Sequence, residues 1–216
     1  MLIEEKDKTF VIDTGPDFRQ QMLRENVKSL DAVIFTHEHK DHTAGFDDVR
    51  AFNFILQRKM DVFASTRVQE AIRREFAYIF SGSNYPGIPQ VELYTIENKA
   101  IEIHGVTFLP IDVLHYKLPV FGYRIGDFTY ITDANYISPE EKEKIKGSKV
   151  VVLNALRREE HISHFTLQQA IDLAQELNAE KTYFTHISHQ LGKHAEVELE
   201  LPLNIELAYD GLQIDL

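Results

Sequence analysis

Three histidines and one aspartate stand close together in the segment His37-Glu38-His39-Lys40-Asp41-His42. The segment follows the apolar run Ala32 to Phe35, which is typical of a buried strand. Imidazole and carboxylate side chains together suit Zn²⁺, Mn²⁺ or Fe. Because α/β proteins place their chemistry in loops at strand ends, this segment predicts a metal site. Alternation along the loop would direct His37 and His39 to one ion, with Asp41 and His42 facing a second.

Three further polar side chains follow strand-like segments later in the chain: His115, Asp133 and His186. Together with the first cluster they make more ligands than one catalytic zinc takes, since such a zinc binds three protein ligands plus water. The set suits two ions if one carboxylate bridges them. Paired ions about 3.5–4 Å apart can share a hydroxide and stabilise both the attacking and the leaving oxygen of a displacement reaction.

The elements that must position these residues are strands in runs, with helices between and after them. Two sheets packed face to face with helices outside would bury the apolar faces. We expect capping boxes at Thr66 with Gln69 and at Thr166 with Gln169, and a hairpin turn at Gly126-Asp127. Strands are predicted at 9–12, 32–35, 60–64, 91–96, 100–103, 106–111, 120–125, 128–132, 150–153 and 181–185, with two more in 203–216; helices are predicted within 16–23, 46–56, 66–79, 138–147 and 166–177.

The composition indicates a globular protein, with 216 residues, 44% of them hydrophobic, and no interdomain linker. We therefore expect one domain over residues 1–216. A net charge of -11 argues against non-specific nucleic-acid binding, which depends on Lys and Arg. The absence of Cys excludes thiolate metal sites and disulfides. No apolar run has membrane-spanning length and the N-terminus lacks a signal-peptide layout, so a cytoplasmic location without membrane contact is predicted.

The segment His37 to His42 resembles the H-x-H-x-D-H signature of the metallo-β-lactamase superfamily. Asp13-Thr14-Gly15 upstream and the three later ligand candidates extend the resemblance over nearly the whole chain. The segments Ile12 to Asp17, His164-Phe165-Thr166 and Thr185 to His189 look like the phosphodiesterase branch, in particular the phosphoribosyl cyclic phosphodiesterase of phosphonate breakdown. The resemblance implies a four-layer αββα sandwich.

The resemblance also implies a division of the ligands between two divalent ions, Zn or Mn. One ion would be held by His37, His39 and His115, and the other by Asp41, His42 and His186, with Asp133 as the bridge. An Asp bridge, rather than the Cys of a common β-lactamase class, speaks against β-lactam hydrolysis. Outside the ligand set, we expect Asp13 to accept a proton from a ligating histidine ring.

His164 lies two residues before Thr166, the expected first cap of a helix, where backbone amides and the helix dipole attract anions. An imidazole there can protonate a leaving alkoxide or hold a phosphoryl oxygen, and the resemblance places a substrate-contacting histidine at this position. We expect His164 and Asp41 to be catalytic. His161 and His189 remain alternatives for the substrate-contacting histidine.

Members of this branch usually begin with an extra strand and a Gly-rich turn that this sequence lacks, so the fold is predicted to miss its first strands. An exposed strand edge would invite pairing, and a homodimer is possible. The predicted function is a two-metal phosphodiesterase acting through a metal-bridged hydroxide on a small cyclic phosphate or nucleotide-like ester. Alternatives are a lactone or thioester hydrolase, a nuclease resembling those that process tRNA 3′ ends, and a metal-binding regulatory protein.

Overall fold

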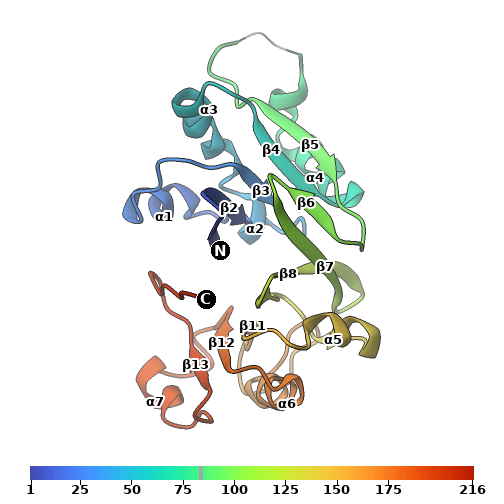
Figure 1. Cartoon of the computed structure of the whole chain (residues 1–216), viewed down its shortest axis with the longest axis vertical. Coiled ribbons are helices and arrows are strands. Elements are labelled where there is room, and N and C mark those ends of the chain that lie inside the picture. The colour runs from blue at the N-terminus through green and yellow to red at the C-terminus, as the bar shows by residue number, and fades with distance from the viewer. Residues whose placement is uncertain (83–84) are drawn as a thin grey trace. The chain divides into compact units, whose positions relative to one another are not determined.

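The computed structural model describes residues 1–82 and 85–216 of the chain, which is mixed α/β (Figure 1). It divides into two compact units, an N-terminal unit of Met1–Val106 and a C-terminal unit of Thr107–Leu216. The expectation of one domain over residues 1–216 stays a prediction. Among the described residues, no helix is long and apolar enough to cross a membrane.

The N-terminal unit is built on a sheet in the strand order β1-β2-β3-β4-β5. β1 and β2 are antiparallel, whereas the remaining neighbours are parallel. Parallel strands end at the same edge of a sheet, so the residues that follow β2 and β3 come together. The elements are β1 (Leu2–Glu5), β2 (Lys8–Ile12), α1 (Phe18–Arg24), β3 (Ala32–Ile34), α2 (Lys40–Thr43), η1 (Phe46–Val49), α3 (Arg50–Leu56), β4 (Met60–Ala64), α4 (Thr66–Glu75), η2 (Ala77–Phe80), β5 (Val91–Thr95) and β6 (Ile101–Ile103).

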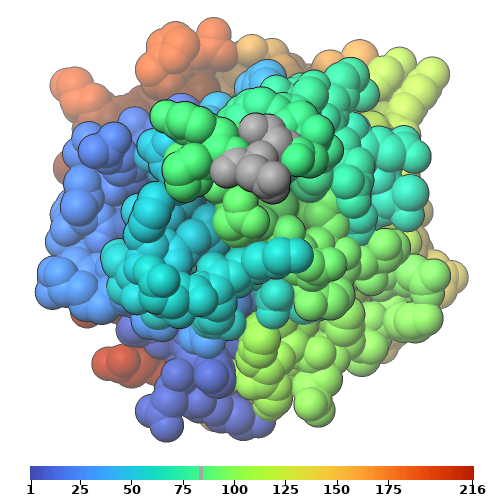
Figure 2. All heavy atoms as spheres, turned by 90° about the horizontal axis from the view of Figure 1, so that it is seen from above, coloured from blue at the N-terminus to red at the C-terminus, as the bar shows by residue number. Residues whose placement is uncertain are grey.

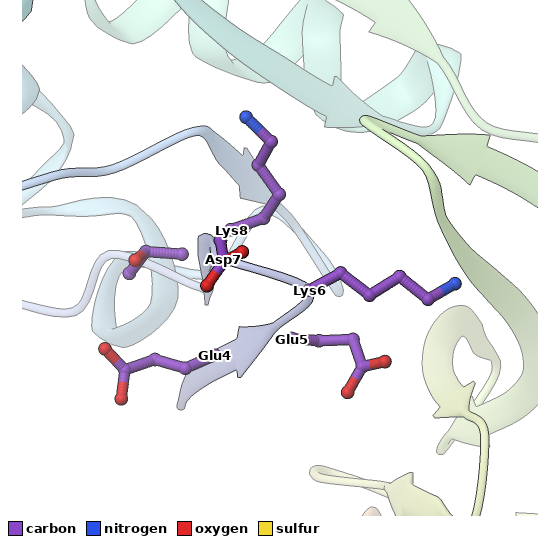
Figure 3. A pocket seen from close by; sticks show the side chains of 6 residues that line it. Glu4, Glu5, Lys6, Asp7 and Lys8 are labelled. Carbon is purple, nitrogen blue, oxygen red and sulfur yellow. The ribbon is translucent and has the colours of Figure 1, made fainter.

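The β1–β2 connection is a two-residue turn formed by Lys6 and Asp7. Both residues have positive φ, 51° and 60°, which is the geometry of the type I′ turn that matches the twist of antiparallel strands. Figure 3 shows the charged side chains around the turn spreading outward from it. Lys6 Nζ donates to the carbonyl of Gly105, 3.1 Å away. The turn is therefore a charged, solvent-facing end of the sheet.

On the outer surface of this unit, α3 lies beside the segment that follows residue 84 (Figure 2). Asn53 Nδ2 donates to the carbonyl of Gln90, and the Gln90 N–H donates back to Asn53 Oδ1 at 2.9 Å. Under this surface, Phe35, Phe46, Val62 and Ile72 belong to one fully enclosed apolar cluster. The cluster holds the helices against the sheet whose ends carry the first histidine group.

Two glycines allow the loop after β2 to lie against the region after α2. A Cβ on Gly45 would lie 2.3 Å from the carbonyl oxygen of Gly15, and one on Gly15 would lie 2.7 Å from the carbonyl oxygen of Asp41. Real Cβ atoms do not approach backbone so closely, so only glycine fits here. The Thr14 N–H donates to the His42 carbonyl, and the Gly45 N–H donates to the Thr14 carbonyl. Asp13 is thereby fixed beside the histidine segment.

The C-terminal unit contains a sheet in the order β10-β7-β8-β9-β11-β12-β13. Neighbours from β10 to β9 are antiparallel, and those from β9 to β13 are parallel. The helices pack on an apolar cluster that includes Leu153, Ala170 and Phe184. The elements are β7 (Val106–His115), β8 (Leu118–Ile125), β9 (Phe128–Tyr130), β10 (Tyr136–Ile137), α5 (Pro139–Ile145), β11 (Val150–Asn154), α6 (Leu167–Leu177), β12 (Lys181–Thr185), α7 (His194–Glu198) and β13 (Ile205–Leu207).

The parallel register aligns the ends of the central strands of this sheet. Val152 pairs with Tyr130, and Asn154 pairs with Thr185. The residues that follow β9, β11 and β12 therefore emerge at one edge. Asp133 and His186 are among them.

Four local expectations have definite outcomes. The capping box is confirmed, because the Thr166 hydroxyl accepts from the Gln169 N–H and the Gln169 side chain accepts from the Thr166 N–H. The hairpin is also confirmed, since the turn at Gly126-Asp127 joins β8 to β9. The capping box at Thr66 is wrong, because Ser65 is the N-cap and its hydroxyl accepts from the Val68 N–H. In 203–216 only β13 forms, and the second strand expected there is wrong.

Candidate metal centre

Asp13 lies at the centre of a hydrogen-bonded group of side chains in the N-terminal unit. Its Oδ1 accepts from the Thr36 N–H at 2.8 Å, and its Oδ2 accepts from the Thr36 hydroxyl at 2.7 Å. His42 Nδ1 lies 2.7 Å from the same Oδ2, and since a carboxylate only accepts, the proton belongs to Nδ1. The lone pair of the His42 ring is therefore on Nε2. This is the contact expected of Asp13 from the sequence.

The same reasoning fixes the tautomer of His37. Its Nδ1 lies 2.9 Å from the Thr36 hydroxyl oxygen. Because that hydroxyl gives its proton to Asp13, the oxygen accepts from His37, whose lone pair is also on Nε2. The His37 ring packs 4.6 Å from the ring of His39 and 4.1 Å from that of His42, centroid to centroid. Three imidazoles are thus gathered at the ends of β3 and α2.

Asp41 completes this group from the first turn of α2. Its Oδ2 lies 3.5 Å from His42 Nε2, and the Asp41 side chain is largely exposed whereas His37 and His42 are buried. Asp41 is thus an exposed carboxylate beside buried imidazole nitrogens, where a cation from solvent can reach it.

In the C-terminal unit the central group is the buried carboxylate of Asp133. His164 Nε2 lies 2.9 Å and His186 Nε2 lies 3.0 Å from Asp133 Oδ1, while the Thr132 hydroxyl donates to Oδ2 at 2.8 Å. The rings of His164 and His186 stack with centroids 4.9 Å apart. One buried carboxylate therefore organises two histidines from different loops.

His115 joins this group from the end of β7. Its Nδ1 donates to the Ser163 carbonyl at 2.9 Å, which leaves the lone pair on Nε2. One ligand atom each from His115, Asp133 and His164 lies within 4.8 Å of the other two, a spacing at which the three can hold one ion. His164, expected only as a catalytic group, is thus also at ligating distance.

Backbone conformation supports the view that these positions are specialised. Asp13, Asp133 and His186 all have positive φ, 62°, 54° and 55°, immediately after strands or a short distance beyond them. Non-glycine residues in the left-handed region cost free energy and cluster at functional sites. The strain redirects each side chain at a strand end.

Two residues that sequence reasoning missed hold the C-terminal group in place. Asn154 is fully buried, and its Oδ1 accepts from the Ala134 N–H at 2.8 Å while its Nδ2 donates to the Ala134 carbonyl at 2.9 Å. This pair of bonds fixes the residue after Asp133. The sequence did carry one signal for Asn154, since it is a polar residue that directly follows the apolar run Val150 to Leu153. Ser163, which binds His115 through its carbonyl, has no comparable signature.

His161 lies beside His164, with the two Nδ1 atoms 3.0 Å apart. Burial lowers the pKa of the His161 ring below its ordinary value, and the neighbouring His164, Arg157 and His186 lower it further. His161 is therefore neutral near pH 7. His189, the other alternative, is exposed in the loop after β12.

The donor set fits a divalent transition metal. Imidazole and carboxylate oxygen ligands suit Zn²⁺ and Mn²⁺. In ligating histidines the second ring nitrogen usually donates to a carboxylate or carbonyl, which orients the ring. His42 and His115 both show this arrangement, with Asp13 and Ser163 as the acceptors.

Comparison with known proteins agrees with this chemistry. Residues 8–187 match the family model of the β-lactamase superfamily domain. A crystal structure described as a new diphosphatase from the PhnP family is 37% identical, covers 100% of this chain and 83% of its own, and superimposes with a TM-score of 0.92.

Two curated relatives carry different names. An octanoyltransferase of Porphyromonas gingivalis is 37% identical over 99% of this chain, and a ribonuclease Z of Prochlorococcus marinus is 21% identical over 58% of it. The chain spans 43% and the aligned region 42% of the length of these relatives. Their names therefore describe longer proteins. The match over residues 8–187 shows that the chain belongs to the β-lactamase superfamily and has the metallo-β-lactamase fold of metal-dependent hydrolases.

Proposed function

We propose that this chain is a two-metal phosphodiesterase that hydrolyses small phosphate esters. The ligands are those that the sequence predicts, with Asp133 as the bridging carboxylate and His164 as the group that assists the leaving oxygen. The proposed ligand set is His37, His39, Asp41, His42, His115, Asp133 and His186.

The observation that supports this proposal most is the 2.9 Å contact between His164 Nε2 and Asp133 Oδ1. It puts a ring nitrogen that can carry a proton next to a carboxylate of the kind that binds divalent ions. An acid beside a metal ligand is what a displacement at phosphorus requires, since the departing alkoxide needs a proton near the point of attack. Both side chains are buried, which strengthens their electrostatic interaction.

Each residue then has a definite task. Bound divalent ions would supply a water of low pKa and neutralise phosphate charge. Asp13 orients the His42 ring, and the Ser163 carbonyl orients the His115 ring. His164 holds a proton at Nε2 for the leaving oxygen. Asp41, exposed at the start of α2, can contact both a metal ion and the incoming water.

A second candidate is hydrolysis of a diphosphate. It is favoured by the 37% identity to the structure described as a diphosphatase. Both reactions break a P–O bond, but the leaving group of a diphosphate is a phosphate, which is much less basic than the alkoxide released from an alkyl ester. That leaving group needs less help from an acid, so the two candidates make different demands on His164.

Acyl transfer and tRNA processing receive less support. The octanoyltransferase is more than twice as long as its matched part, so its name does not assign octanoyl chemistry to that part. The identity to ribonuclease Z is low, and the net charge of -11 disfavours a polyanion. Both activities can be assayed alongside phosphodiester hydrolysis.

The test is a comparison of substrates on protein reconstituted with Mn²⁺ or Zn²⁺. We expect metal-dependent hydrolysis of bis-p-nitrophenyl phosphate and of an alkyl cyclic phosphate, with octanoyl thioester cleavage at least about 100-fold slower in kcat/KM, a ratio typical of specific sites. Faster cleavage of a diphosphate diester than of either phosphodiester would favour the second candidate. Faster cleavage of the thioester would refute both.

A matched variant examines the assignment of His164. His164→Ala should lower kcat on the alkyl phosphate by about 10²- to 10⁴-fold, the range for a general acid, and lower it much less on p-nitrophenyl esters. Metal content measured by atomic emission should stay at two ions per chain. A loss of metal would make His164 a ligand instead.

A further inference from the structure

We propose that Arg67 and Glu75 on α4 are positioning residues of the candidate metal centre, which hold the ligand segment, His37 to His42, in place through two ion pairs of opposite polarity. Arg67 pairs with Glu38, and Glu75 pairs with Lys40. All of these residues belong to the N-terminal unit. The inference rests on the metal binding contained in the proposed function, and it does not depend on the substrate.

The first observation is how side chains are distributed along the ligand segment. The rings of His37 and His39 pack against each other with centroids 4.6 Å apart, so they share one side of the chain. The backbone at His39 is extended, with φ −63° and ψ 152°, and successive side chains of an extended chain point to opposite sides. Glu38, between the two rings, and Lys40, after them, contact α4 instead.

Glu38 makes the connection nearest to the ligands. Arg67 Nε lies 3.0 Å from Glu38 Oε1 and 3.2 Å from Oε2, so both carboxylate oxygens share one donor. The Glu38 side chain is 20% exposed, and salt screens a partly buried pair less than a fully exposed one. The pair therefore ties the backbone between His37 and His39 to the first turn of α4.

Lys40 makes the second connection, at the other end of the helix. Its ammonium pairs with the carboxylate of Glu75, the last residue of α4, and lies 5.8 Å from the centroid of the Phe76 ring. The helix rise places Arg67 and Glu75 about 12 Å apart along the axis. Two contacts at this separation restrain both the position and the direction of the ligand segment, which a single contact would not.

The two charges on α4 run against the preference of the helix dipole, which favours acidic residues in the first turn and basic residues in the last. Arg67 stands in the first turn, which has no acidic residue, and Glu75 ends the helix. Arg73 and Arg74 in the last turn follow the preference. Local helix stability therefore does not explain Arg67 and Glu75, whereas their partners in the ligand segment do.

The helix is a rigid base for these contacts. Val68 and Ile72 are buried in the apolar cluster of the N-terminal unit. The Ser65 hydroxyl caps the first turn, and Gln69 Nε2 donates to the Ala64 carbonyl at the end of β4, 3.1 Å away. Since α4 is fixed to the sheet, side chains that reach from it can fix the ligand segment in turn.

The experiment measures the Zn²⁺ affinity of the full chain, by competition with a chelator, in two variants of opposite charge change. Arg67→Gln removes a positive charge near the site, and Glu75→Gln removes a negative one. If the pairs acted through charge alone, the first substitution would strengthen Zn²⁺ binding and the second would weaken it. Loss of positioning weakens binding in both. Arg74→Gln and Glu70→Gln, at exposed positions of the same helix, are the matched controls.

We expect Arg67→Gln to weaken Zn²⁺ binding by about 5- to 10-fold, between the effect of an exposed ion pair and that of a residue bonded to a ligating histidine. Glu75→Gln should weaken it by about 2- to 5-fold, because Lys40 is largely exposed. Both controls should stay within about 2-fold of the wild type.

Amide hydrogen exchange of the metal-free chain gives a second readout, which does not depend on Zn²⁺. The N–H groups of His42 and Thr43 donate to the His39 carbonyl, so their exchange reports whether the ligand segment stays folded. Exchange should be faster in Arg67→Glu, which brings two carboxylates together. Adding Glu38→Arg to that variant restores an ion pair of reversed polarity and should slow the exchange again.

Shifts of Zn²⁺ affinity in opposite directions for Arg67→Gln and Glu75→Gln would overturn the inference. Affinities equal to those of the controls would also overturn it, as would a reversed pair that exchanges as fast as Arg67→Glu alone. If the affinities follow the expected pattern but the wild type cleaves no phosphodiester, only the proposed function fails. Phosphodiester cleavage with unchanged affinities in the variants would refute the inference alone.

Discussion

The two groups of candidate ligands are built in different ways. In the N-terminal unit, one short segment from the end of β3 into α2 supplies His37, His39, Asp41 and His42. One carboxylate, Asp13, holds two of their rings: it contacts His42 directly and His37 through the Thr36 hydroxyl. In the C-terminal unit, His115 ends β7, whereas Asp133, His164 and His186 come from three separate connections between elements. There the fold must bring the ligands together before any chemistry is possible.

The difference shows where each group obtains its rigidity. The N-terminal group is held by a nearby hydrogen-bond network, with the close approach at Gly15 and Gly45 setting the loops. The C-terminal group depends on strand register, on the buried Asn154 and on positive φ at Asp133 and His186. Substitutions in the second group should therefore affect both folding and activity, whereas those in the first should act on the metal site alone.

Of the supporting and bridging carboxylates, Asp133 is expected to give the larger effect, because two histidines and a threonine hydroxyl contact its carboxylate. Asp133→Asn should lower kcat/KM on a phosphodiester by about 10²- to 10³-fold, the scale for removing one strong electrostatic contact in a site. Kinetics combined with metal analysis measure this. Full activity with two bound ions would show that Asp133 is no bridge.

Asp13 should matter less, since it supports His42 without being a proposed ligand. Asp13→Asn is expected to weaken metal affinity or activity by about 10- to 100-fold, as for other partners of ligating histidines. Titration with Zn²⁺ and a competing chelator measures it. Asp17→Asn is the matched control, because Asp17 is exposed and makes no capping hydrogen bond. Equal effects of the two substitutions would contradict the role of Asp13.

Asn154→Ala tests the dependence of the C-terminal group on its support. Two buried backbone groups of Ala134 would lose their partners, so the free energy of unfolding should fall by about 1–3 kcal/mol, and activity should fall with it. Gln168→Ala, which removes only an exposed contact to Asp172 on α6, should change stability by less than about 0.5 kcal/mol. Urea denaturation of both variants provides the values.

An effect on stability alone, and one that depends on pH, is expected at Asp31, a buried carboxylate away from the histidines. Burial raises the pKa of Asp31, but the Thr9 N–H and the charges of Lys8 and Arg58 outweigh it, and the net pKa lies below the ordinary value. A lowered pKa stabilises the fold above the unfolded-state pKa of about 3.9, and this stabilisation is lost as the pH falls through the folded-state pKa.

Asp31→Asn should therefore lower the free energy of unfolding by about 1–3 kcal/mol at pH 7. The difference in this free energy between the variant and the wild type should narrow below about pH 4. Metal binding and turnover at pH 7 should be those of the wild type. A gap that widens in acid would show that the sign of the pKa shift is wrong.

Prediction from sequence succeeded where the signal was local. The segment from His37 to His42 and the strand β12 ending before His186 could be identified from residue types and apolar runs. That Asp13 accepts a proton from a histidine ring was expected from the general chemistry of metal-binding histidines, without identifying His42 as the partner. The family match over residues 8–187 confirms the resemblance and the fold.

What sequence could not provide were contacts made by backbone or by position in space. The Ser163 carbonyl that orients His115 leaves no trace in residue type, and Asn154 resembles any polar residue at a strand end. The N-cap at Ser65 was missed because Thr66 also has capping chemistry, and only the backbone angles distinguish them.

The most direct test of the account is anomalous diffraction from crystals of the full chain grown with Zn²⁺ and, separately, with Mn²⁺. The proposal predicts two ions per chain, with Asp133 contacting both and the remaining ligands divided between His37, His39 and His115 on one side and Asp41, His42 and His186 on the other. A single ion, or ions that leave Asp133 without a metal contact, would contradict it.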